Sequence, residues 1–250
     1  MNPTDQPVGD TARSNTTWPV QLQLPGQAAA PDGPVDMIMM YVMHHAFRRD
    51  LATFAAVVKA TPLDDRRTWR ALARRWELFA TALHHHHTGE DSGLWPLLTA
   101  RTDDAGRRLL TAMEDEHSQI DPILDACAAG LGRMCNAPDP DVRAALVVRL
   151  VAGKESLGRH LAHEETDAIA LVQQVMTSAE WDQLEADHFR PQHLSRVRQL
   201  QLMCWALHEL PTSALERLLL TAPILQRLIW LITRPAFERG ERRAFRYRPA

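Results

Sequence analysis

The chain contains few cysteines and no strong excess of charge of one sign. Among its 250 residues only Cys127, Cys135 and Cys204 carry a thiol. This sparse and odd number argues against a disulfide framework and fits a reducing compartment. The formal net charge is only −3, so no global attraction to nucleic acid is expected, and we predict no nucleic-acid partner.

Signals for secretion and for membrane insertion are also missing from the sequence. The N-terminal residues contain neither the basic region nor the apolar region of a signal peptide. The most apolar stretch, residues 218–232, is interrupted by Pro223 and Arg227. It is too short for a bilayer, which needs about 20 consecutive apolar residues. We therefore expect a cytoplasmic protein without a transmembrane segment.

No segment shows the alternating pattern of a strand, and helical periodicity dominates after residue 33. Residues 1–33 are rich in Pro, Gly, Ala, Thr and Asn and have no sustained period, which predicts a disordered arm. In residues 34–176, apolar side chains recur every three or four positions, as in a helical bundle. The expected helices are 34–59, 65–98, 105–129, which would end at Gly130 and Gly132, and 141–176. Residues 177–250 predict a C-terminal helical extension, so the fold class is all-α.

Each of the four expected helices places a histidine where its apolar stripe would otherwise continue. In the second and fourth helices a glutamate follows four residues later, on the same face of the helix. The six residues are His44, His86, Glu90, His117, His160 and Glu164. Buried polar groups are costly unless something binds them. The sequence therefore predicts a metal site inside the bundle.

The spacing of these residues along the chain supports a shared site. If the four helices alternate in direction, with a rise of roughly 1.5 Å per residue, all six residues fall at one level. Within the run His84–His87, successive side chains rotate by about 100° around the helix. We therefore expect only His86 on the inner stripe, with His84 and His85 facing mostly outward.

The ordered pieces H…HxxxE…H…HxxxE resemble the metal signature of the hemerythrin-like HHE cation-binding family. The resemblance covers residues 34–176 and implies an antiparallel, up-down-up-down four-helix bundle. It further implies two non-haem irons per chain, bridged by the carboxylates of Glu90 and Glu164 and by an oxo or hydroxo group. Imidazole and carboxylate ligands suit iron without any thiolate. The exogenous ligand that the resemblance implies is O₂, hydrogen peroxide or NO.

Three further residues lie beside the predicted site. Tyr41 precedes His44 by one turn and is either a core residue or a phenol that contacts iron. His87 lies next to the inner stripe, and Asp91 follows it by four residues. His87 and Asp91 could therefore take the places of His86 and Glu90 if the helix is rotated by one residue. Asp121 occupies the position four residues after His117, where respiratory hemerythrins carry histidine. It is a ligand, an acceptor for a ligand, or a solvated side chain.

Two functional hypotheses follow from these features. With fewer histidines than a respiratory hemerythrin, the site favours ferric iron, and therefore binding or turnover of small oxidants over reversible O₂ carriage. Catalase-like or peroxidase-like activity is the enzymatic form of this hypothesis. The alternative is an iron- or oxygen-responsive sensor without turnover, which docks a partner or a second copy through residues 177–250. The segment 211–250 carries eight arginines and three glutamates.

A ferritin-like di-iron site is the nearest rival within the metal-binding class. Such a site needs Glu-x-x-His motifs on two helices and single glutamates on two others. The first expected helix contains no glutamate, and Glu114 of the third lies off the inner stripe. We therefore set the ferritin-like interpretation aside.

Overall fold

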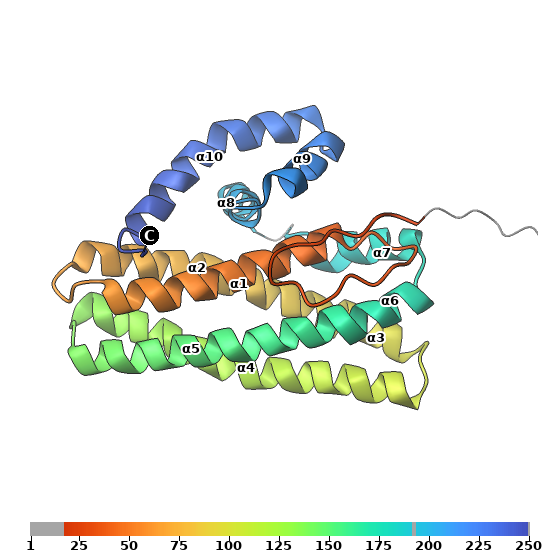
Figure 1. Cartoon of the computed structure of the whole chain (residues 1–250), viewed down its shortest axis with the longest axis horizontal. Coiled ribbons are helices and arrows are strands. Elements are labelled where there is room, and N and C mark those ends of the chain that lie inside the picture. The colour runs from red at the N-terminus through yellow and green to blue at the C-terminus, as the bar shows by residue number, and fades with distance from the viewer. Residues whose placement is uncertain (1–17, 192–193, 250) are drawn as a thin grey trace, which may run out of the picture.

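The computed structural model describes residues 18–191 and 194–249. Within these residues every regular element is helical, as the periodicity predicted. Four long helices lie side by side (Figure 1). They are α1 (Ile38–Ala60), α2 (Arg66–Gly89), α4 (Asp104–Asn136) and α5 (Pro140–His163). None of the helices in the described ranges is both long enough and apolar enough to span a membrane.

Local sequence signals account for most of the helix ends. Asp65, Asp103 and Asp139 each accept hydrogen bonds from backbone N–H groups at the start of the following helix, which is the usual role of an N-cap aspartate. The expected end at Gly130 is wrong, because α4 continues to Asn136. A Cβ atom at Gly130 would lie 3.0 Å from Cδ1 of Leu146. This glycine therefore permits the close approach of α5 and does not end the helix.

The second and fourth expected helices each contain a π-helical turn followed by a short helix. The elements are η1 (Glu90–Leu94), α3 (Trp95–Thr99), η2 (Glu164–Ala168) and α6 (Ile169–Val175). The backbone N–H of Trp95 donates to the carbonyl of Glu90, and that of Ile169 donates to the carbonyl of Glu164. Both π turns therefore begin at the glutamate of an HxxxE motif. Such turns occur frequently at functional sites.

The residues before α1 differ from the expected disordered arm. Residues 1–17 lie outside the described residues, but residues 18–33 form a non-helical segment with a turn at 25–26 that packs on the rest of the protein. Leu22 and Leu24 are buried, and the side chain of Gln21 donates to the carbonyl of Val35 at 2.8 Å. The expectation is corrected for this part, because the two leucines bury apolar surface and the glutamine satisfies backbone groups.

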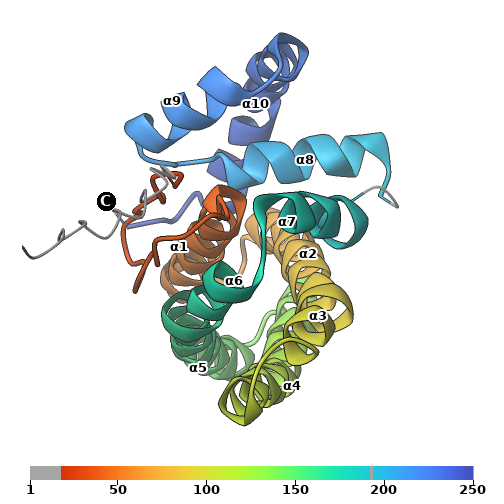
Figure 2. The same ribbon diagram turned by 90° about the vertical axis from the view of Figure 1, so that its right-hand side faces the viewer.

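The C-terminal extension folds back over α1 and α2, and α8 crosses above them (Figure 2). Its elements are α7 (Ser178–Leu184), η3 (Glu185–Phe189), α8 (Arg196–Ala206), α9 (Thr212–Thr221) and α10 (Ile224–Ala244). Trp205 of α8 is fully buried, and its ring centroid lies 5.4 Å from that of Phe47 on α1. The extension therefore shares a core with the long helices.

Buried ion pairs join the extension to the long helices. The indole Nε1 of Trp205 donates to Asp50 at 2.7 Å, and Asp50 Oδ2 lies 2.8 Å from Arg75 Nη2. Arg75 in turn pairs with Glu241 of α10. Burial opposes ionisation of Asp50, but the charges of Arg75 and Arg49 outweigh it and hold the pKa of Asp50 below its usual value.

We expect Asp50→Asn to lower the free energy of unfolding by about 3–5 kcal/mol, because the substitution removes a buried countercharge from Arg75. The matched control is Asp104→Asn, which breaks an exposed pair with Arg107 and should cost less than about 1 kcal/mol. Urea unfolding followed by circular dichroism measures both values. Equal losses in the two variants would show that the buried pairs do not hold the extension in place.

Candidate metal centre

Seven buried side chains form two neighbouring groups between the long helices. The first group contains His44, His86, Glu90 and Glu164, and the second contains His87, His117 and His160. In each group, one nitrogen or oxygen atom of every residue lies within 4.8 Å of the others. None of the seven residues is more than 4% exposed. The structure thus brings together all six predicted residues and adds His87.

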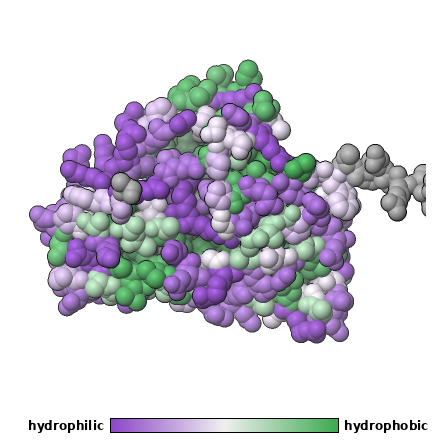
Figure 3. Space-filling view, in the orientation of Figure 1, coloured by the Kyte–Doolittle hydropathy of each residue, from purple (hydrophilic) through white to green (hydrophobic). Residues whose placement is uncertain are grey.

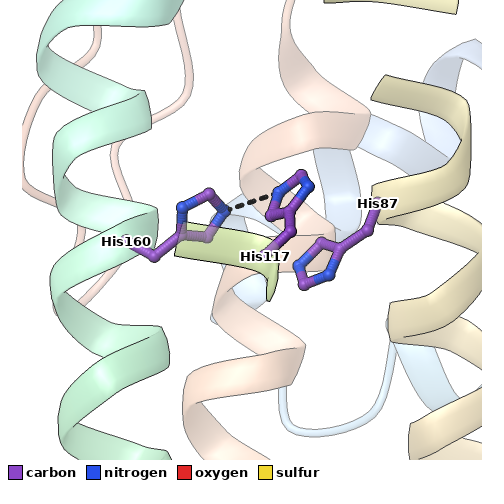
Figure 4. A group of neighbouring side chains, drawn as sticks. All are labelled: His87, His117 and His160. Atoms are coloured by element: carbon purple, nitrogen blue, oxygen red, sulfur yellow. Dashed lines mark hydrogen bonds between the residues drawn. The ribbon is translucent and has the colours of Figure 1, made fainter. Parts of the chain in front are cut away.

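The second group draws its histidines from three helices, α2, α4 and α5, and their rings lie close to one another (Figure 4). The rings of His87 and His117 stack with centroids 3.8 Å apart. Nε2 of His117 lies 3.1 Å from Nε2 of His160. Two imidazole nitrogens from different helices therefore meet at the centre of this group.

Carboxylates determine which nitrogen of these two rings carries the hydrogen. Nδ1 of His117 lies 2.9 Å from Asp91 Oδ1, and Nδ1 of His160 lies 2.8 Å from Glu116 Oε2. An ionised carboxylate can only accept, so both Nδ1 atoms donate; in the neutral tautomer that carries its hydrogen on Nδ1, the Nε2 atom of each ring presents a lone pair. Two facing lone pairs repel each other unless a cation lies between them. Neutral imidazole is also the form that binds metals, so this contact fits a metal site.

In the first group, two carboxylates lack hydrogen bonds. Among the described residues, none donates a hydrogen bond to any of the four side-chain oxygens of Glu90 and Glu164. Glu90 Oε1 lies 3.1 Å from His86 Nε2, and Glu90 Oε2 lies 3.6 Å from His117 Nε2. Glu90 therefore faces both groups. Glu164 Oε2 lies 3.3 Å from His44 Nε2. Buried carboxylate oxygens without hydrogen bonds are costly, and cations at these positions would satisfy them.

Burial and neighbouring charges shift the protonation of the site. Burial, together with the charge of Glu164, raises the pKa of Glu90 well above its usual value. Burial disfavours a charge on His44, but Glu164 and Glu165 outweigh it and raise the pKa of His44 to about 9. Burial lowers the pKa of His87 to about 4, so its imidazole is neutral at pH 7. His87 therefore offers a lone pair without first losing a proton.

The expectation that only His86 of the histidine run faces inward is wrong. His86 and His87 are both buried, whereas His84 is exposed. The inner face of a bundle helix is about 100° wide or more, which accommodates two adjacent side chains. The ring centroid of His86 lies 5.2 Å from that of His44 on α1, while His87 stacks on His117 of α4. Each histidine thus meets a different neighbouring helix.

The other two residues singled out from the sequence lie at the edges of the groups. Tyr41 is 1% exposed, and its hydroxyl has no hydrogen-bond partner within the described part of the chain. Burial and the charges of Glu165 and Glu164 raise the pKa of Tyr41, so the phenol stays protonated. Asp121 Oδ1 lies 3.9 Å from His87 Nδ1, and its side chain is 60% exposed. Asp121 is thus an outer neighbour of His87.

Three carboxylates hold the imidazole rings, a role that sequence reasoning did not assign to any of them; it considered Asp91 only as an alternative ligand in a register shifted by one residue. They are Asp91 beside His117, Glu116 beside His160, and Glu165 beside His44. Glu165 also accepts two hydrogen bonds from Arg48, at 2.6 and 2.8 Å. Asp91 and Glu165 directly follow the glutamates of the two HxxxE motifs. The pair of adjacent acids in each motif was a sequence signal for this role. In each π turn the first acid faces the site, and the second accepts a hydrogen bond from a histidine of another helix.

We expect Glu165→Gln to weaken binding of Fe²⁺ by roughly 10–100-fold, because the substitution removes the charged acceptor that orients His44. Glu155→Gln, at an exposed position of α5, should leave the affinity unchanged. Competition with a chromophoric chelator measures both affinities. Unchanged affinity in Glu165→Gln would show that the outer carboxylate does not support the site.

Comparison with known proteins gives one match. A family model described as the hemerythrin HHE cation binding domain matches residues 38–172, a range that contains all seven residues of the two groups. No curated protein and no solved structure matches the chain. The family model spans more than half of the chain, and the chain therefore belongs to the hemerythrin HHE cation-binding domain family.

Proposed function

We propose that this protein is a di-iron hemerythrin-like protein that binds or turns over O₂, hydrogen peroxide or NO. The observation that carries the proposal is the pair of adjoining buried groups. One side-chain oxygen of Glu90 faces the first group, and the other oxygen faces the second group. Imidazole and carboxylate ligands suit iron. The three cysteines are unpaired, which supports a reducing cytoplasm as the location.

In this proposal the long helices form an antiparallel, up-down-up-down bundle, and each group holds one iron. Two histidines would hold the first iron and three the second, while Glu90 and Glu164 would serve both. When bound, the iron pair supplies redox chemistry for small oxidants. The group with two histidines offers fewer nitrogen ligands and hence more room for a small molecule. The hydroxyl of Tyr41 donates to no group in the described ranges, and the charges of Glu165 and Glu164 act on it, so it is a hydrogen-bond donor available at that side.

The surface of α9 and α10 favours a second candidate function, that of an iron- or oxygen-responsive sensor without turnover. Six apolar side chains there are each at least half exposed: Leu220, Ile224, Leu225, Leu228, Leu231 and Ile232. Green, apolar patches lie among purple, polar ones at the top of the molecule, where α9 and α10 are (Figure 3). Large exposed apolar patches often mark protein–protein interfaces. In this candidate, iron binding would order the core, and the patch would contact another protein or a second copy.

We expect His87→Ala to reduce the iron content from two atoms per chain to one, because it removes a ligand from the group with three histidines. His86→Ala should instead lose the iron of the other group. The control, His84→Ala, removes an exposed imidazole of the same run and should retain both irons. Elemental analysis after loading with Fe²⁺ measures the stoichiometry. Two irons bound at unchanged affinity in His87→Ala would refute the role proposed for His87.

We further expect the iron-loaded protein to consume hydrogen peroxide, and azide to produce a new visible absorption band. His87→Ala should consume peroxide at least about tenfold more slowly, because loss of a residue that only supports a metal ligand already costs roughly 10–100-fold in affinity or activity. His84→Ala serves again as the control. If the protein retains two irons but shows neither an azide band nor peroxide consumption, the sensor becomes the better hypothesis.

A further inference from the structure

A cavity lies between the C-terminal extension and the helices that carry the first group of buried residues. Its volume is about 350 Å³, and its walls come from α1, α2, α7, η3, α8, α9 and α10. Ligand pockets in proteins typically measure about 300–1,000 Å³. The cavity is thus large enough for an organic molecule and lies apart from the space between His87, His117 and His160.

The lining of this cavity is mainly apolar and adaptable. Methionines contribute from two sides, at Met39, Met40, Met43 and Met203. Methionine side chains are flexible and polarisable, and they recur at surfaces that bind varied apolar partners. Aromatic rings of Trp181, Phe189 and Trp230 complete the wall. These side chains favour a carbon-rich ligand.

The polar groups at the edge of the cavity are largely engaged within the protein. The guanidinium of Arg227 donates to the carbonyls of Ala222 and Leu220, at 2.8 and 2.6 Å. The amide of Gln199 donates to two carbonyls of the segment before α8. Burial raises the pKa of Glu185, which favours its uncharged form. An uncharged ligand matches these surroundings best.

The cavity reaches His86, which belongs to the first group of buried residues. The ring of Phe189 lies 6.1 Å from the ring of His86, measured between centroids. Gly89 permits this approach, because a Cβ atom there would lie 2.9 Å from Phe189 Cδ1. The aromatic wall and His86 are therefore held together by close packing of η3 on α2.

We propose that this cavity binds an uncharged, apolar organic molecule of about a dozen non-hydrogen atoms against His86. The size follows from the volume, which holds about twelve waters at roughly 30 Å³ each. Such a ligand is distinct from the small oxidants of the proposed function and would place a carbon-rich molecule beside the metal centre. Binding depends on the packing of the extension and does not require iron.

Binding of decan-1-ol to the metal-free full chain tests the proposal, with isothermal calorimetry as the measurement. We expect saturable binding of one molecule per chain. Leu219→Trp should weaken binding by at least about tenfold, because Leu219 lines the cavity and the larger ring fills it. Leu220→Trp is the matched control: it makes the same change at the next residue of α9, which is 74% exposed, and should bind as the wild type does.

A second cavity-filling variant, Met203→Trp, acts from the opposite wall and is used if Leu219→Trp does not give a native circular dichroism spectrum. Nuclear magnetic resonance of histidine-labelled, metal-free protein locates the ligand: decan-1-ol should shift the imidazole signals of His86 and leave those of His84 unchanged. Decanoate and decylamine, with the same chain and opposite charges, should bind more weakly than the alcohol.

Three results would overturn the proposal. Absence of saturable binding by the wild type would remove the site. Equal affinities in Leu219→Trp and Leu220→Trp would place the alcohol on the exposed apolar surface of α9 and α10. Tighter binding of either charged analogue would refute the ligand class. Because the assay uses metal-free protein, none of these results depends on whether the chain binds iron.

Discussion

Two fully buried carboxylates, Glu90 and Glu164, impose the constraint on which the centre of this protein depends. They lie within one group of side chains, and no described residue donates a hydrogen bond to them. Charges removed from water are costly unless they are paired. The five surrounding imidazoles supply only part of this compensation, because burial holds the pKa values of His86, His87 and His160 below their usual range. Cations bound in the core would therefore supply the compensation that the imidazoles do not.

The same constraint explains the layer of acids outside the histidines. Asp91, Glu116 and Glu165 each accept from an Nδ1 atom and leave the opposite nitrogen facing inward. Two of these acids lie in π-helical turns that begin at the inner glutamates. Adjacent acids in one turn thus serve different helices. This arrangement joins α1 to η2 and α4 to η1 through the site itself.

The C-terminal extension belongs to the same structure as the metal centre and is not a separate appendage. Trp205 packs at a tilt against Phe47, whose ring centroid lies 5.2 Å from that of His86. Asp50 accepts a hydrogen bond from the indole of Trp205. A chain of buried contacts therefore runs from α8 to a residue of the first group. Through η3 and α8, the extension also builds the apolar cavity against His86. The extension thus forms most of the wall of the cavity on that side of the centre.

The amino-acid sequence by itself determined the helical class, the four long helices and the six inward-facing residues. It could do so because helical periodicity places a residue on a face without knowledge of its neighbours. Only the tertiary structure decided that His87 joins the site. His87 faces inward because α2 packs against both α1 and α4, and His87 meets His117 of α4. The outer acids, the packing of residues 18–33 and the cavity beside His86 also depend on contacts between segments far apart in the chain. The periodicity of one helix carries no information about such contacts, because the packing of the helices against one another decides which side chains meet.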